Sequence, residues 1–301
     1  MPNKTFIAES FRQLQDRICT GLETLDGTGR FAEDQWNRAE GGGGRSRTIS
    51  GSLIEKGGVN FSEVYGELSE GGAKALKTSA GKFFATGVSI VLHPRNPWMP
   101  IIHMNVRYFE LESAAWWFGG GIDLTPHYID PKAAGKFHQQ LKNTCDDHHP
   151  LFYPKFKKQA DDYFYLPHRK ETRGVGGIFF DRLGVDQELK KQQLFDFTLA
   201  VGDSFLPCYE QQALLKRALN HTERELAWQS IRRGRYVEFN LVWDRGTKFG
   251  LETGGRTESI LMSMPPIAKW EYNHQVKSNS LEDQTLKGLQ KGIDWINYTQ
   301  G

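Results

Sequence analysis

The sequence is poor in cysteine, and its cysteines are not spaced for a disulfide framework or a redox motif. Only three occur in the 301 residues, at Cys19, Cys145 and Cys208, and no C-x-x-C is present. Because any disulfide scheme leaves one thiol unpaired, the cysteine content indicates a reducing compartment.

Long apolar runs and a strong charge bias are also missing. No uncharged apolar stretch approaches membrane-spanning length, and residues 1–4 lead straight into an amphipathic segment without an apolar signal core. The formal net charge is +2, and no dense run of lysine and arginine occurs. We therefore expect a cytoplasmic protein with no transmembrane segment and no nucleic-acid partner.

The motifs of several enzyme classes are absent. No G-x-G-x-x-G opens a helix after a strand, neither glycine run (41–44, 119–121) is followed by Lys-Ser/Thr, and no serine lies in a G-x-S-x-G turn. No cysteine has the flanking residues of a nucleophile either. These absences argue against a nucleotide-binding loop and against covalent catalysis.

The pattern of expected elements favours a single α+β domain over residues 1–301. An apolar stripe (Ile7, Phe11, Leu14, Ile18, Leu22) before Gly27 predicts a first helix. Strands separated by short gaps, without regular alternation with helices, favour a large antiparallel sheet. The glycines at 41–44 and 57–58 are expected in turns. We expect strands within 33–64 and at 83–93, 101–111, 177–182, 235–243 and 259–264, and helices at 131–149, 152–165, 186–218, 222–233 and 281–297.

One expected strand carries an unusual set of polar residues. Between positions 101 and 110, His103, Asn105 and Arg107 alternate with apolar residues. Successive side chains of a strand point to opposite faces, so these three would line a cavity while the others face a core. The preceding strand presents Ser89 and His93 at the same spacing. The sequence thus predicts an anion-binding wall with two histidines.

Four of the nine histidines, His93, His103, His138 and His168, lie in segments expected at or near the sheet. Together they could bind a divalent metal, although the chain has neither an H-E-x-x-H motif nor a Cys/His ladder. Each could instead act as an acid or base near neutral pH, or be a hydrogen-bonded structural residue. The structural reading is strongest for His138, which follows Phe137 on an expected helix.

Five arginines lie beside glycines, turns or strand ends: Arg107, Arg169, Arg173, Arg245 and Arg256. Such positions leave a guanidinium free to bind a carboxylate through two hydrogen bonds, so their convergence would suit a substrate with several carboxylates. The alternative for each of them is a solvent-exposed charge.

Three further segments are candidates for a binding site. Residues 116–126 join bulky aromatics to three glycines and would suit a large flat ligand, or else form core and a tight bend. Asp244 and Arg245 present a carboxylate beside a guanidinium, where the alternative is a turn-capping aspartate. Gly254, Gly255 and Arg256 could form an anion-binding nest.

Taken together, these motifs resemble those of the oxygen-dependent coproporphyrinogen III oxidases, from one end of the chain to the other. The resemblance is carried by 14–19 (LQDRIC), 41–47 (GGGGRSR), 55–60 (EKGGVN), 93–97 (HPRNP), 103–107 (HMNVR), 116–126 (WWFGGGIDLTP), 168–174 (HRKETRG) and 234–241 (GRYVEFNL).

This resemblance implies oxidative decarboxylation of the ring A and B propionates of coproporphyrinogen III to vinyl groups, giving protoporphyrinogen IX in haem biosynthesis. It implies O2 as co-substrate, no organic cofactor, and a homodimer with contacts in 236–272. It also implies a flat antiparallel sheet between helical layers, in a three-layer arrangement. The implied metal ligands are His93, His103, His138 and His168, with His103 as proton donor, and the implied substrate contacts are Ser89, Asn105, Val106, Arg107, Arg245, Gly254, Gly255 and Arg256.

Asp244 matches an aspartate that faces the pyrrole N–H groups, and we expect it to stabilise positive charge that develops on the pyrrole. Two rival interpretations remain. One is a metal-dependent oxygenase that uses the four histidines. The other is a tetrapyrrole-binding protein without catalytic activity.

Overall fold

The computed structural model describes residues 1–298 except 69, 77, 114, 187–188 and 253–254. Its centre is a seven-stranded sheet in the order β1-β2-β3-β4-β5-β6-β9, in which every neighbouring pair is antiparallel. The expected α+β class with a large antiparallel sheet is therefore confirmed. The strands are β1 (Ala32–Asn37), β2 (Gly42–Ile49), β3 (Ile54–Leu68), β4 (Gly81–Pro94), β5 (Ile101–Leu111), β6 (Trp116–Thr125) and β9 (Gly176–Asp186), with a small separate hairpin of β7 (Tyr165–Leu166) and β8 (Glu171–Thr172).

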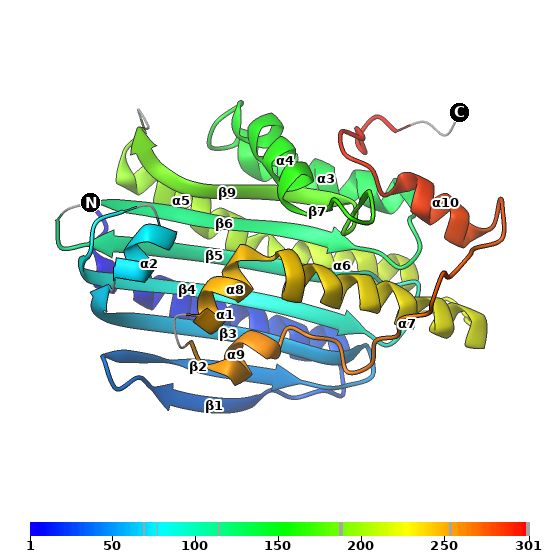
Figure 1. The fold of residues 1–301 in the computed structure, drawn as a ribbon, viewed down its shortest axis with the longest axis horizontal. Coiled ribbons are helices and arrows are strands. Elements are labelled where there is room, and N and C mark those ends of the chain that lie inside the picture. Colours follow the sequence, from blue (N-terminus) through cyan, green and yellow to red (C-terminus); the bar gives the residue numbers. More distant parts are fainter. Residues whose placement is uncertain (69, 77, 114, 187–188, 253–254, 299–301) are drawn as a thin grey trace.

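Helices lie on both faces of the sheet (Figure 1). One layer contains α1, α5 and α6, which lie behind the strands in the view of Figure 1, and α7, α8 and α9 lie in front of them. No helix in the described part of the chain is long and apolar enough to cross a membrane. The helical segments are α1 (Lys4–Asp26), α2 (Glu70–Ala75), α3 (Pro131–Asp146), α4 (Phe152–Tyr163), α5 (Lys191–Asp203), α6 (Phe205–Lys216), α7 (Glu223–Glu238), the π-helix η1 (Phe239–Trp243), α8 (Arg245–Glu252), α9 (Thr257–Leu261) and α10 (Leu281–Gly288).

The first helix forms as its sequence predicts. Asn3 accepts a hydrogen bond from the backbone N–H of Phe6 at the start of α1, and Gly27 ends the helix with φ of 85°. All five residues of the predicted stripe are buried against the sheet and the helices beside it. Burial of each large apolar side chain stabilises the fold by about 1.5–3 kcal/mol.

The two faces of β5 differ as the alternation predicts. Ile102, Met104 and Val106 are fully buried in the main hydrophobic cluster, on what we call the core face of the sheet. His103, Asn105 and Arg107 lie on the opposite face, which we call the site face, and are only partly buried. The site face is the one that α7, η1, α8 and α9 cover.

The strand predicted for residues 235–243 is wrong, because this segment completes α7 and forms η1. Its aromatic and β-branched residues favour a strand by propensity. In the fold, however, Tyr236, Phe239 and Asn240 are buried at helical spacing, and the Asn240 side chain donates to the carbonyl of Tyr236 at 2.8 Å. Packing against the site face overrides local propensity here.

Other element boundaries also differ from the expectation. The strand predicted for residues 259–264 is wrong, because residues 257–261 form α9 and a turn follows, and the last helix ends at Gly288 instead of near 297. The long helix expected at 186–218 is divided into α5 and α6 at Ser204. The glycines at 42–44 and 57–58 lie within β2 and β3 and not in turns.

Candidate active site

A row of polar side chains crosses the site face of the sheet. The strand register places Ser46, Asn60, Ser89 and Asn105 side by side on β2, β3, β4 and β5. The hydroxyl of Ser46 donates to Oδ1 of Asn60 at 2.7 Å, and it lies 3.0 Å from the hydroxyl of Ser259 on α9. Ser89 and Asn105 are therefore direct neighbours on adjacent strands of the site face.

Glycines form the rest of this floor. Arg107 pairs with Gly87 on one side and Gly119 on the other, and Asn105 pairs with Gly121. A Cβ atom at Gly119 would lie 2.7 Å from Nε of Arg107, so the absence of a side chain leaves space for the guanidinium. The 116–126 segment is thus largely a strand and not a bend, with Phe118 in the core and its glycines under the site.

A buried cluster occupies one end of the site face. Nδ1 of His103 lies 2.8 Å from Oδ1 of Asp123, the residue opposite it on β6. The Arg173 guanidinium donates to both carboxylate oxygens of Asp123, at 2.7 and 3.3 Å. A carboxylate partner at Nδ1 fixes the proton on that nitrogen, which leaves Nε2 of the part-exposed imidazole for chemistry.

Three aromatic rings and the side-chain amide of Asn240 enclose Arg173. Its guanidinium carbon lies 4.2 Å from the ring centroid of Phe164, 4.9 Å from that of Tyr236 and 4.7 Å from that of Phe239. Burial raises the pKa of Asp123, but the charge of Arg173 and the bond from His103 outweigh it, so this pKa lies below its ordinary value. Asp123 is therefore a buried carboxylate that stays ionised.

Asp244 lies at the turn between η1 and α8. Its Oδ1 accepts a hydrogen bond from the Tyr163 hydroxyl at 2.7 Å, and its Oδ2 accepts one from the backbone N–H of Thr247 at 2.6 Å. Burial and the neighbouring Asp244 charge raise the pKa of Tyr163 well above its ordinary range, so the phenol remains a donor. Asp244 therefore caps α8, as the alternative interpretation predicted, while its carboxylate is held beside the site.

A cavity of about 340 Å³ opens next to Asp244. Arg245 contributes to the wall of this cavity, and its guanidinium carbon lies 5.0 Å from the ring centroid of Tyr163. Arg107 reaches the same region, because its Nη2 donates to Oδ1 of Asp181, a residue that lines the cavity, at 2.8 Å. The lining residues are Gln159, Asp162, Tyr163, Phe179, Asp181 and Arg245.

The predicted nest at residues 254–256 is described only in part. Gly254 lies outside the described residues. The backbone N–H of Gly255 donates to the carbonyl of Gly250 at 2.7 Å, and Arg256 is paired with Asp34 of β1 and donates to Ser259 at 3.1 Å. In this arrangement Arg256 fastens α9 to the edge of the sheet.

One implied substrate contact faces away from the site. The side chain of Val106 lies on the core face and is fully buried, because it follows Asn105 by one position in a strand. The Val106 side chain therefore cannot contact a ligand on the site face.

The four predicted metal ligands do not form one site. His93 is buried, with Nε2 bonded to the carbonyl of Ser263 at 2.8 Å. His138 lies on α3 with both ring nitrogens engaged, by the Tyr153 hydroxyl at 3.0 Å and the Val175 carbonyl at 2.9 Å. Burial lowers the pKa of His93 to about 3 and that of His138 to about 4.

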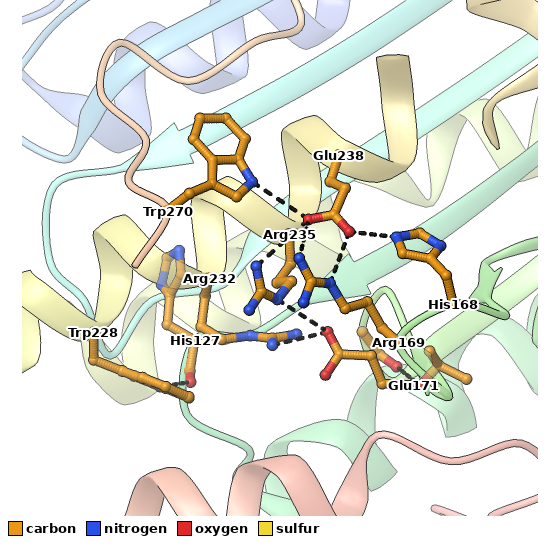
Figure 2. Close-up of polar contacts among 11 residues, drawn as sticks. His127, His168, Arg169, Glu171, Trp228, Arg232, Arg235, Glu238 and Trp270 are labelled. Carbon is orange, nitrogen blue, oxygen red and sulfur yellow. Dashed lines mark hydrogen bonds and ion pairs between the residues drawn. The ribbon is translucent and has the colours of Figure 1, made fainter. Parts of the chain in front are cut away.

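His168 belongs to a different network, shown in Figure 2. Its Nε2 bonds to Glu238, and its Nδ1 accepts from the Trp243 indole at 2.8 Å. Across the described ranges, no group of three or more histidine, cysteine, aspartate or glutamate side chains is arranged to hold a metal ion. The donor set of the implied metal centre therefore does not fit a shared ion.

Glu238 is the centre of that network. Arg169 donates to both of its carboxylate oxygens, at 2.8 and 3.0 Å, and Arg235 and the Trp270 indole also contact it (Figure 2). Burial raises the pKa of Glu238, but the bonds from Arg169 and His168 outweigh it and lower the pKa to about 2. The network joins the β7–β8 hairpin to the end of α7, directly before η1 and Asp244.

The sequence did not identify Asp123, Tyr163, Asp181 or Glu238 as site residues. Asp123 lies within the quoted 116–126 segment, but its pairing with His103 depends on the register between β5 and β6. Of the five arginines singled out, Arg245 lines the cavity, Arg107 donates to the lining residue Asp181, and Arg173 is buried against Asp123.

A family model described as coproporphyrinogen III oxidase matches residues 6–295. The match covers both the buried cluster and the cavity.

Proposed function

The chain belongs to the coproporphyrinogen III oxidase family, and from this premise we propose that it uses O2 to convert coproporphyrinogen III to protoporphyrinogen IX. Membership makes it an enzyme of haem biosynthesis. The proposal adds that the ring A and B propionates become vinyl groups and that dioxygen is the oxidant. The observation that carries it is the glycine floor, with a histidine–carboxylate pair at one end and two arginines with Asp244 at the other.

The atom balance of the reaction assigns a task to His103. Each propionate loses CO2 and a hydride equivalent, so RCH2CH2COO⁻ + O2 + H⁺ gives RCH=CH2 + CO2 + H2O2. One proton must be supplied for every propionate. In our proposal the imidazolium form of His103 donates this proton from Nε2, while Asp123 accepts the hydrogen bond from Nδ1–H and orients the ring.

The other end of the site positions the substrate and stabilises charge. We assign binding of propionate carboxylates to Arg107 and Arg245, because a guanidinium matches a carboxylate in geometry and charge. Asp244 then stabilises positive charge that develops on the electron-rich pyrrole as electrons leave toward O2. Tyr163 and Thr247 hold this carboxylate in place.

The proposed reaction uses no organic cofactor, since a porphyrinogen is itself electron-rich and the protein need only orient it and manage protons. No step is assigned to a metal ion, because the predicted ligands do not converge. The rival metal-dependent oxygenase would need a rearranged histidine set. We place the activity in the cytoplasm, in line with the unpaired cysteines.

We also propose that the protein acts as a homodimer, with contacts in residues 236–272. This stretch carries a concentration of large apolar side chains that are exposed in the single chain, as expected of a surface that a partner covers. They are Leu241, Val242, Trp243, Leu251, Ile267, Trp270 and Tyr272. Light scattering of the purified protein measures the mass directly, and a monomer at micromolar concentration would contradict the proposal.

The decisive experiment is turnover of coproporphyrinogen III by chelator-treated protein, first without oxygen and then in air. We expect divinyl product and hydrogen peroxide only in air, with no metal detected by elemental analysis. Activity that returns only with added metal would favour the four-histidine oxygenase. Binding without product under both conditions would favour the tetrapyrrole carrier.

A further inference from the structure

We propose that Asp181 is a built-in competitor for the carboxylate-binding position at Arg107, and that it sets the affinity of the site for its substrate. This inference rests on the proposed function, which assigns Arg107 to a substrate carboxylate. It adds a residue of the protein that occupies that position when substrate is absent.

The geometry of the pair matches that of a bound carboxylate. Nη2 of Arg107 donates to Oδ1 of Asp181 at 2.8 Å, the ordinary length of a charge-assisted hydrogen bond. Gly119 lies under both partners, because a Cβ there would be 2.7 Å from Nε of Arg107 and 3.1 Å from Oδ1 of Asp181. The glycine floor thus leaves room for a guanidinium together with one carboxylate.

The position is also open to a ligand. The Arg107 side chain is 41% exposed and that of Asp181 is 43% exposed, and Asp181 lines the 340 Å³ cavity beside Arg245 and Tyr163. A propionate that enters this cavity can bind Nη2 of Arg107, the same atom that now donates to Asp181. The Asp181 carboxylate can then turn into solvent, which a buried carboxylate could not do.

The Arg107 guanidinium stays in place when a substrate carboxylate replaces that of Asp181. Nη1 of Arg107 donates to Oδ1 of Asn105 at 3.3 Å, on a different nitrogen from the one that binds Asp181. The amide of Asn105 therefore keeps hold of Arg107 while the carboxylate partner changes. When no substrate carboxylate is present, Asp181 returns and neutralises the arginine.

The same cavity provides a matched control. Asp162 also lines it, but its carboxylate is bound to Lys158 at 2.8 Å and to Lys291 at 2.9 Å. Asp181→Asn and Asp162→Asn make the same isosteric change and remove the same charge from one cavity. Only the first frees Arg107.

The test measures binding of coproporphyrin III, the stable oxidised form with the same four propionates, by fluorescence titration. We expect Asp181→Asn to tighten binding by about two- to five-fold, the range expected when an exposed ion pair no longer has to be broken. Asp162→Asn should leave the dissociation constant unchanged. In an Arg107→Gln background, Asp181→Asn should have no effect, because the contested position is gone.

Weaker binding by Asp181→Asn would overturn the inference, since it would make Asp181 a support for Arg107. An equal gain from Asp162→Asn would overturn it as well, by showing a general charge effect. A protein that binds coproporphyrin III and shows the Asp181 effect, yet forms no vinyl product in air, would refute the proposed reaction alone. Absence of any binding would refute both.

Discussion

Two arginine–aspartate pairs lie on the same face of the sheet and differ in burial. Arg173 and Asp123 are 2% and 1% exposed, whereas Arg107 and Asp181 are 41% and 43% exposed. The closest N–O distances are almost equal, 2.7 and 2.8 Å. Distance alone therefore does not distinguish a fixed structural pair from an exchangeable one.

Their surroundings explain the difference. Three aromatic rings enclose Arg173, so water cannot replace either partner if the other is lost. Arg107 rests on Gly119 beside an open cavity, where water or a ligand carboxylate can take the place of Asp181. The buried pair holds His103 in position, and the exposed pair lets a charged ligand enter.

The largest expected effect comes from breaking the buried pair. Arg173→Met leaves the Asp123 carboxyl group buried without its cation, so we expect the free energy of unfolding to fall by about 3–5 kcal/mol in urea titrations. Arg107→Met is the control and should cost at most about 1 kcal/mol. Equal losses for the two variants would show that burial does not separate the pairs.

The Asp244→Asn variant tests whether the carboxylate beside the cavity takes part in catalysis. Asp244→Asn keeps the shape of the side chain and can still accept the Thr247 N–H, but it removes the negative charge. We expect kcat to fall about 10²–10³-fold with little change in the free energy of unfolding. Tyr163→Phe retains the carboxylate and serves as the milder companion, and near-normal turnover of folded Asp244→Asn would refute the role.

Asp123→Asn tests the catalytic role of the buried cluster of Asp123, His103 and Arg173. The amide retains the volume of the carboxylate but weakens control of the His103 orientation, so we expect kcat to fall about 100-fold while KM changes little. The split between kcat and KM is read from steady-state kinetics of variant and wild type. A change confined to KM would place Asp123 in substrate binding instead.

The buried histidines His93 and His138 make the stability of the fold depend on pH. The pKa values of His93 and His138, about 3 and about 4 in the folded protein, lie below the ordinary 6.5, so the unfolded chain binds more protons as the pH falls. Their contribution to stability is complete above pH 6.5 and is lost as the pH falls toward the folded values. At pH 5 the loss is about 2 kcal/mol for each histidine.

Unfolding titrations of His138→Gln between pH 5 and pH 7 measure this slope. The variant should be less stable at pH 7 but lose less stability on acidification than wild type. His221→Gln, which alters an exposed position, should follow the wild-type slope. An unchanged slope for His138→Gln would show that this histidine is not held neutral by burial.

Sequence patterns predicted the elements whose burial repeats regularly. The stripe of α1 and the alternation of β5 were confirmed because their local period matches the packing that buries them. Residues 235–243 were predicted incorrectly because their β-forming side chains are packed as a helix. Local propensity cannot report which surface of the sheet a segment will cover.

The candidate site was recovered only where it follows local spacing. The polar row of His103, Asn105 and Arg107 needs only the period of a strand. The Asp123–His103–Arg173 cluster needs the register of two strands and a residue from the loop after β8, and sequence spacing contains neither. The predicted metal set failed to converge for the same reason, since His138 lies on a helix outside the site face.

The π-helix η1 determines in which direction the side chains of the following segment, which carries Asp244 and Arg245, point. The backbone N–H of Asp244 bonds to the carbonyl of Phe239, five residues earlier, at 2.9 Å. Each residue of an α-helix turns the chain by about 100°, so deleting one residue from η1 would rotate everything after it by about that angle. Tyr236 and Phe239 would stay packed while the carboxylate faced elsewhere. We therefore expect insertion or deletion of a single residue in this segment to disturb the site more than most substitutions in it do.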